Sequence, residues 1–173
     1  MRRYNATVRI YDIRYAEEQA AKIEAALRYV EVQAEAVLDI GCGTGILFNY
    51  VAEKAAMTVG IDISPKTLLK AKERARSHPN VYLVCADADN MPLKDNVFDR
   101  AFAITVIQNM PNQIETLDEI RRVAKDNALI VVTGLKKIFP KSKLEEMLNN
   151  GGLSVTAMSD EGLQCYVAVC SKA

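Results

Sequence analysis

The first candidates for chemistry are an acid and a run of glycines. Asp39 stands just before Gly41, Gly43 and Gly45, in a turn of the pattern G-x-G-x-G. Glycines have no Cβ and let a ligand approach the backbone closely. Free N–H groups at the start of a following helix attract a carboxylate or a phosphate. The turn therefore predicts a small-molecule site, although a tight strand-to-helix connection also uses glycines for structural reasons.

The spacing and the charge of this turn argue against a dinucleotide. A dinucleotide-binding turn needs a third glycine for close helix packing, and Ile46 stands in that place. Asp39 would repel a pyrophosphate but would attract the ammonium of a methionyl group. A nicotinamide-dependent oxidoreductase is therefore the weaker hypothesis.

Two more acids follow the next two apolar segments. Asp62 is placed to accept hydrogen bonds from both hydroxyls of a ribose, although it could also cap the helix that begins after Ser64. Asp87 could accept from an adenine amino group while the Ala88 backbone addresses a ring nitrogen, or it could be an ordinary loop aspartate. Three acids at three successive segment ends favour a nucleoside site.

Strand-like and helix-like segments alternate around these acids. An apolar stripe from Ala16 to Val30 predicts an N-terminal helix. Strands are predicted over residues 36–40, 57–61, 81–84, 98–104 and 128–133, and helices over 46–56, 65–77, 113–124 and 141–148. Two β-like segments, 153–158 and 163–170, flank turn-forming residues and predict a hairpin. The pattern predicts a doubly wound α/β fold, mostly parallel, with an antiparallel edge.

Composition narrows the class of protein but not its function. The 173 residues are 50% hydrophobic and 25% charged, as in an ordinary globular protein, and 22 basic residues balance 22 acidic ones. There is no strong nucleic-acid signature and no apolar run long enough to cross a membrane. The four cysteines are Cys42, Cys85, Cys165 and Cys170, and they form no C-x-x-C pair. We therefore expect no metal site, and we expect the thiols to be reduced in the cytoplasm.

Here the sequence resembles class I S-adenosylmethionine-dependent methyltransferases. Residues 37–45 are similar to the first motif of that family, and residues 60–64 to its acidic motif after the second strand. Residues 85–93 resemble its adenine-binding stretch and the D-A-x-x-L-P pattern of the small-molecule subgroup. Residues 98–110 and 119–133 resemble later elements of the same fold.

The resemblance implies a fold, a cofactor and a set of contacts. The expected fold is a seven-stranded sheet with helices on both faces. The length of the chain separately predicts a single domain over residues 1–173. Residues 1–33 would form a lid segment and helix, and residues 34–173 a Rossmann-like core. The cofactor would be S-adenosylmethionine. The implied cofactor-binding residues are Asp39, Gly41, Cys42, Gly43 and Gly45 around the methionyl part, Asp62 at the ribose, Ile63, Asp87 and Ala88 at the adenine, and Thr105.

The methyl acceptor is the least readable part of the sequence. The substrate-pocket candidates are Tyr11, Tyr15, Gln108 and Asn109, although tyrosines before a helix are often packing anchors and the other two could simply begin a helix. Residues 104–107 lack the Asn/Asp-Pro-Pro-Tyr/Phe motif of the subgroup of this family that methylates the amino groups of nucleic-acid bases or glutamine, which argues against that chemistry. The lone His78 is expected on the surface at the wrong end of the sheet for a general base.

The predicted activity is methyl transfer to a small molecule, an RNA or a protein. The alternative is a non-catalytic or partner-activated binding subunit. The candidate partners are the acceptor, a second copy of the chain and a small activating protein.

Overall fold

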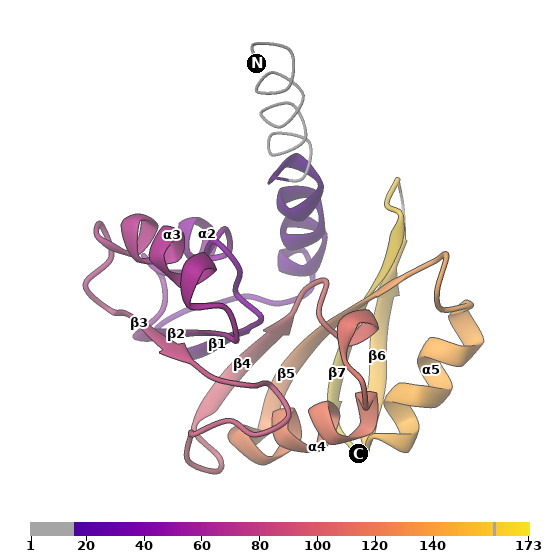
Figure 1. The fold of residues 1–173 in the computed structure, drawn as a ribbon. Helices are drawn as coiled ribbons and strands as arrows, with labels where there is room; N and C mark the ends of the chain where they lie inside the picture. Colours follow the sequence, from indigo (N-terminus) through magenta and orange to yellow (C-terminus); the bar gives the residue numbers. More distant parts are fainter. Residues whose placement is uncertain (1–15, 161) are drawn as a thin grey trace.

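The computed structural model describes residues 16–160 and 162–173. In this part of the chain seven strands form one sheet in the order β3-β2-β1-β4-β5-β7-β6 (Figure 1). The strands are β1 (Ala36–Ile40), β2 (Met57–Asp62), β3 (Val81–Cys85), β4 (Phe98–Ala103), β5 (Ala124–Leu135), β6 (Leu153–Ser159) and β7 (Cys165–Lys172). Strands β1 to β5 are parallel, and β7 runs antiparallel between β5 and β6. The predicted fold, with its antiparallel hairpin, is confirmed.

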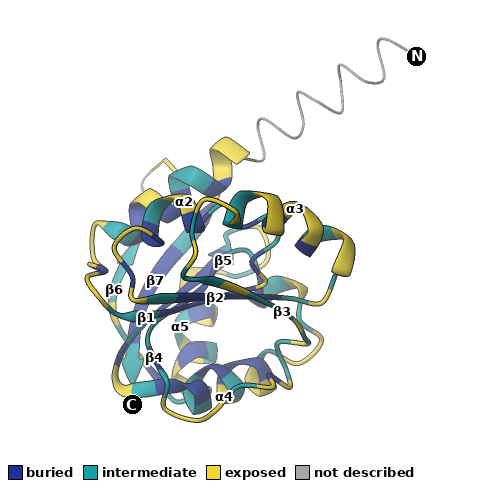
Figure 2. Ribbon diagram, turned by 90° about the vertical axis from the view of Figure 1, so that its left-hand side faces the viewer, coloured by how far each residue is buried: buried dark blue, intermediate teal, exposed yellow. Residues whose placement is uncertain are grey.

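Helices cover both faces of the sheet, as predicted. Figure 2 shows α2 and α3 on one side of the sheet, seen along its edge, and α4 on the other. The helical elements are residues 16–27, α2 (Phe48–Val51), α3 (Pro65–Ala75), the short 3₁₀ helix η1 (Ile107–Asn109), α4 (Gln113–Val123) and α5 (Lys141–Asn150). Because both faces are buried, the central parallel strands are apolar on both sides rather than alternating.

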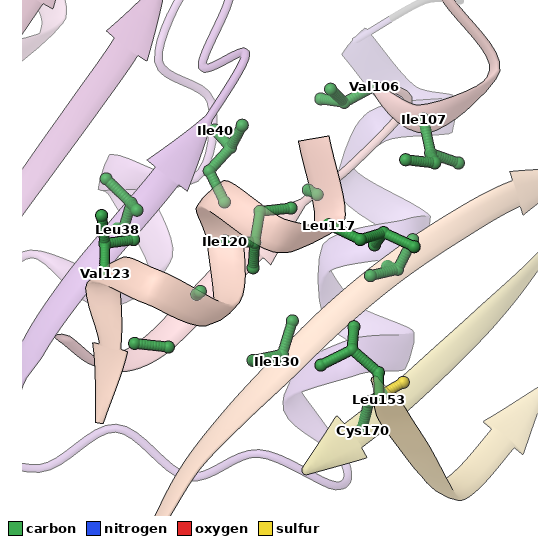
Figure 3. Packing of buried hydrophobic residues seen from close by; sticks show 14 of the residues in the cluster. Leu38, Ile40, Val106, Ile107, Leu117, Ile120, Val123, Ile130, Leu153 and Cys170 are labelled. Atoms are coloured by element: carbon green, nitrogen blue, oxygen red, sulfur yellow. The ribbon is translucent and has the colours of Figure 1, made fainter. Parts of the chain in front are cut away.

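Side chains of strand β1 pack into the hydrophobic cores on both faces of the sheet. Leu38 and Ile40 point into the core shared with α4 and α5, while Val37 packs in the core beneath helix 16–27. Helix α4 contributes Leu117 and Ile120 to the first of these cores, both fully buried (Figure 3). Each such side chain contributes about 1.5–3 kcal/mol through burial.

The predicted start of α3 is confirmed. The Ser64 hydroxyl accepts a hydrogen bond from the Thr67 amide at 3.3 Å, and Pro65 occupies the first turn, where a missing N–H costs nothing. Helix α4 begins in the same way, because the Asn112 side chain accepts from the Ile114 amide at 3.2 Å.

The helix predicted over residues 46–56 is wrong in its extent. Helix α2 covers only four residues, and turns flank it on both sides. One reason is that the Asn80 side chain donates to the carbonyl oxygens of Ala52 and Ala55, at 2.8 and 2.9 Å. These side-chain bonds satisfy carbonyls at the C-terminal end of the turn, where a helix has unsatisfied ones.

Strand β5 is longer at both ends than the predicted 128–133. The amides of Asn96 and Val97 bond to the carbonyls of Arg122 and Val123, so pairing with the β4 side begins directly after α4. An irregularity between Phe98 and Arg100 in the β4–β5 pairing accommodates the polar residues early in β5.

The order of the strands determines where a ligand can bind. The chain moves outward from β1 to β2 and β3, then returns to place β4 on the other side of β1. At this switch point the loops after β1 and β4 diverge, and a crevice opens at the carboxyl ends of the strands. The predicted glycine turn follows β1 at this point. Among the described residues, no helix is long and apolar enough to span a membrane.

Candidate functional site

The three glycines of the turn after β1 serve different purposes. All three have left-handed backbones, with φ of +62° at Gly41, +55° at Gly43 and +75° at Gly45. A Cβ on Gly41 would lie 2.7 Å from the Val106 side chain, and one on Gly45 would lie 2.3 Å from the Phe48 ring. A Cβ on Gly43 would meet only a carbonyl oxygen at 4.0 Å. The structural explanation therefore holds for Gly41 and Gly45, and only Gly43 faces open space.

Hydrogen bonds from β2 and α3 hold the turn in place. The Gly43 amide donates to Asp62 Oδ2 and the Ser64 amide donates to Asp62 Oδ1, both at 2.9 Å. From α3, the Arg74 guanidinium donates to the carbonyl and hydroxyl oxygens of Thr44. Asp62 thus ties the turn to the end of β2, and each of its oxygens keeps a second lone pair for another donor.

Two adjoining cavities open along the carboxyl ends of the strands. The smaller, of about 130 Å³, is lined by Gln19, Ile23, Asp39, Gly41, Cys42, Gly43, Thr44, Ile46, Leu47, Thr67 and Ile104. The larger, of about 570 Å³, is lined by Gly41, Gly43, Ile61, Asp62, Ile63, Thr67, Ala86, Asp87, Ala88, Thr105, Val106, Asn109, Met110 and Pro111. Both cavities share Gly41, Gly43 and Thr67, so the glycine turn lies between them.

Most of the predicted cofactor-binding residues line one of these cavities. Those in the smaller cavity are Asp39, Gly41, Cys42 and Gly43, and those in the larger are Gly41, Gly43, Asp62, Ile63, Asp87, Ala88 and Thr105. Gly45 lines neither, in keeping with its packing against Phe48.

The substrate-pocket candidates are divided. Asn109 lines the larger cavity, and its side chain donates to the Thr105 carbonyl at 2.8 Å. Gln108 lines neither cavity, and both polar atoms of its amide are buried with no hydrogen-bond partner in the described part of the chain. Tyr11 and Tyr15 lie outside the described residues.

The electrostatics of the smaller cavity favour a cation. Asp39 is 4% exposed, and burial together with the nearby charge of Asp62 raises the pKa of its carboxyl well above 3.8. No hydrogen bond from the described residues opposes that shift. Burial also raises the pKa of the Cys42 thiol, which keeps it neutral. A positively charged group beside Asp39 would relieve the cost of its ionised form.

The loop after β3 is anchored to α4. Asp87 Oδ1 accepts from the Asp89 amide at 3.1 Å, while Asp89 itself accepts a hydrogen bond from the Thr116 hydroxyl. Glu119 accepts from the Met91 amide at 2.8 Å and pairs with Arg122, which lowers its pKa despite its partial burial. The loop that carries Asp87 is therefore held to α4 at two points.

Sequence reasoning missed Gln19 and Lys22 on the helix of residues 16–27. Gln19 is 6% exposed and Lys22 is 1% exposed, although both are polar. Each stands one position before an apolar residue of the predicted stripe, Ala20 or Ile23, and this adjacency was the available signal. His78 is half-buried just before β3, at the amino end of the strands and away from both cavities.

A doubly wound seven-stranded sheet, with a glycine turn after β1 and acids near the carboxyl ends of β1, β2 and β3, defines the class I methyltransferase architecture. The comparisons agree with this class. A family model described as a methyltransferase domain matches residues 38–132. The chain belongs to this methyltransferase family.

Named relatives illustrate the range of the family. The chain is 32% identical over 139 residues to a malonyl-[acyl-carrier protein] O-methyltransferase of Marinomonas, covering 79% of this chain and 51% of that protein. A methyltransferase structure from Aquifex aeolicus has a TM-score of 0.80 at 19% identity, covering 88% of this chain and 89% of that one.

A third match was solved together with a partner. It is the Haloferax volcanii complex between the Trm112 methyltransferase activator and a methyltransferase, with a TM-score of 0.82 at 15% identity and coverage of 94% and 93%. At these identities the solved structures show the fold alone. The chain spans about half the length of the curated relatives it matches, or less.

Proposed function

We propose that the protein transfers a methyl group from S-adenosylmethionine to an acceptor that is a small molecule, an RNA or a protein. One observation carries the proposal: two cavities meet at the glycine turn, and acids at the carboxyl ends of neighbouring parallel strands line them. Asp39 lines the smaller cavity, and Asp62 and Asp87 line the larger. Their shared border and their mixture of apolar and acidic groups suit a cationic nucleoside with a zwitterionic tail.

The proposed arrangement follows the lining of the two cavities. The adenine would lie between Ile63 and Ala88 in the larger cavity, with Asp87 accepting from its amino group. The ribose would lie over Asp62, whose free lone pairs can accept from two hydroxyls. The methionyl tail would pass Gly43 into the smaller cavity, where Asp39 would face its ammonium.

The chemistry of this reaction requires positioning more than catalytic side chains. The cofactor supplies an electrophilic methyl group on a sulfonium, so the S–C bond breaks as the bond to the acceptor forms in line with it. The contribution of this chain would be to fix that line of attack and to exclude water. Asn109, Met110 and Pro111 border the larger cavity after β4 and are the described residues best placed to contact an acceptor.

The organisation along the chain follows from the same proposal. Residues 34–173 would form the cofactor-binding core, and residues 1–33, which include Tyr11 and Tyr15, would cover it. The helix of residues 16–27 supports this assignment, because its Gln19 and Ile23 already line the smaller cavity. We place the protein in the cytoplasm, where its free cysteines, including the exposed Cys85, would remain reduced.

The test is calorimetric titration of the purified protein with S-adenosylmethionine. The unaltered protein should bind, and Asp62→Ala should weaken binding by roughly 10- to 100-fold, the loss typical of hydrogen bonds to a charged group. Asp118→Ala is the matched control, because Asp118 is exposed on α4 and, among residues 16–160 and 162–173, pairs only with Arg121. Absence of binding by the unaltered protein would refute the proposal.

A second hypothesis is that activity requires a partner, either a second copy or a small activating subunit. It is supported by the fold match to a chain solved with its activator, and by the open outer edge of β3, which exposes 55% of Tyr82. Light scattering during the titration would test it. A monodisperse monomer that binds cofactor and methylates an acceptor without any addition would exclude this hypothesis.

A further inference from the structure

Gln19 is a buried polar residue with a free donor at the end of the smaller cavity. Its side chain is 94% withdrawn from solvent, since only 6% is exposed, and its Nε2 is buried with no hydrogen-bond partner among the described residues. The same residue lines the cavity together with Asp39, Gly41 and Gly43. A buried amide nitrogen without a partner costs about 1–3 kcal/mol, so it calls for an explanation.

A chain of hydrogen bonds fixes which atom of this amide is free. Lys22 Nζ donates to Thr105 Oγ1 at 3.0 Å, and Thr105 Oγ1 in turn donates to Gln19 Oε1 at 3.0 Å. Because an ammonium can only donate, the Thr105 hydroxyl must accept from it and pass its own hydrogen to the Gln19 oxygen. The amide nitrogen is therefore the group left unbonded.

The two residues that orient the Gln19 amide, Lys22 and Thr105, are themselves constrained. Lys22 is 1% exposed and is also paired with Glu18 at 2.7 Å, so its orientation is set. Thr105 has φ of +64°, an unusual backbone for a β-branched residue, and its amide donates to the Thr133 hydroxyl at 2.7 Å. A costly conformation held from several sides marks a site that the surrounding fold keeps in place.

We propose that the Gln19 amide nitrogen binds the carboxylate of the methionyl tail of the cofactor, and that Lys22 and Thr105 are positioning residues for it. This inference rests on the proposed function. The smaller cavity would then be complementary to a zwitterion, with Asp39 facing the ammonium and Gln19 and the Gly43 side of the turn facing the carboxylate. Charge decides the orientation, because a ligand carboxylate beside Asp39 would be repelled.

The assignment has a consequence for selectivity. A site that buries a donor for the carboxylate discriminates against ligands that lack it, because the donor is then left unpaired. The protein should bind S-adenosylhomocysteine more tightly than its decarboxylated analogue, which keeps the adenosine, the sulfur and the ammonium. The difference should be roughly 10- to 100-fold, as for a hydrogen bond to a charged group.

The experiment is a comparison of ligands across variants, by calorimetric titration. Gln19→Glu places a negative charge where the donor was and should abolish the preference for S-adenosylhomocysteine over the decarboxylated analogue. Gln33→Glu adds the same charge at an exposed position before β1, at the far end of that strand, and should keep the preference. Methylthioadenosine, which lacks the whole tail, should bind all three proteins equally and so reports that the variants are folded.

The positioning residues are tested in the same way. Thr105→Val removes the hydroxyl that orients the amide and should reduce the preference, whereas Thr105→Ser keeps the hydroxyl and should restore it. If Gln19→Glu does not fold, Gln19→Met removes the donor without adding charge and should show the same loss of preference.

The role of Gln19 and the proposed function would be refuted by different results. Equal weakening of S-adenosylhomocysteine and the decarboxylated analogue by the Gln19 variants, or no weakening of either, would refute the role of Gln19 and leave the proposed function intact. Failure of the unaltered protein to bind any of the three adenosine ligands would refute the proposed function itself.

Discussion

Replacing Asp39 with asparagine should make the protein more stable and a poorer binder of its cofactor. Asp39 is 4% exposed, and burial and the charge of Asp62 raise its pKa, so the ionised carboxylate is costly in the folded chain. Asparagine has the same shape without the charge. Removing an uncompensated buried charge should raise the free energy of unfolding by about 1–3 kcal/mol. For a chain of this size that is about 2–4 °C in Tm for each kcal/mol.

The stability gained by Asp39→Asn should depend on pH. Because the folded pKa of Asp39 lies above the unfolded value of 3.8, the folded protein holds this proton more tightly than the unfolded chain does. Its contribution to stability is therefore present below the unfolded pKa and is lost as pH rises through the folded pKa. The advantage of Asp39→Asn should be absent near pH 3.8 and reach its full size above the folded pKa.

Urea unfolding across this pH range, with calorimetric titration of S-adenosylmethionine at pH 7, measures both effects. Asp99→Asn is the control of opposite sign. Burial raises the pKa of Asp99, but hydrogen bonds from Lys125 and from the Ala36 amide outweigh this and lower it. That variant should lose stability. A destabilised Asp39→Asn at pH 7 would mean that the Asp39 carboxylate is compensated in the folded protein, and the reasoning would fail.

Three other substitutions test the turn and its supports. Gly45→Ala should lower the free energy of unfolding by more than about 2 kcal/mol, since it adds a clash with Phe48 to the left-handed strain, as thermal melts would show. Gly43→Ala should cost only about 1 kcal/mol yet weaken S-adenosylhomocysteine binding, and equal destabilisation by both alanines would contradict the division of roles. Glu119→Gln should cost about 1 kcal/mol at pH 7 by releasing Arg122. That loss should shrink as pH falls below 4.5 through the lowered pKa of Glu119, and a pH-independent loss would exclude the ion pair as its cause.

The sequence predicted the sheet well because its signals are local. Apolar runs close to Asp39, Asp62 and Asp87 predict β1, β2 and β3. Such runs are apolar throughout because both faces of the sheet are buried. The Ser64 cap is equally local. The predicted extent of α2 was wrong because the chain after α2 is held by Asn80, a residue from a distant loop that donates to the carbonyls of Ala52 and Ala55 just beyond the helix.

The sequence predicted the site residues whose role follows from their residue type alone. It could not predict roles that depend on a residue brought close only by the fold. Gly41 and Gly45 look like ligand-approach glycines in the sequence, but Val106 and Phe48 are what exclude a Cβ there. Gln19 lies on a helix well before the turn, and only the folded arrangement brings its amide to the cavity beside Asp39.

The position of β7 in the sheet bears on how the chain is made. Although β7 is the last strand along the sequence, it lies inside the sheet and pairs with both β5 and β6. A nascent chain that has emerged only through β6 leaves β5 as a bare edge and β6 without a neighbour. Such an exposed apolar edge invites association with other chains. Completion of the sheet must therefore wait until residues 165–172 have left the ribosome, and truncations in β7 should aggregate even though every proposed ligand contact lies elsewhere.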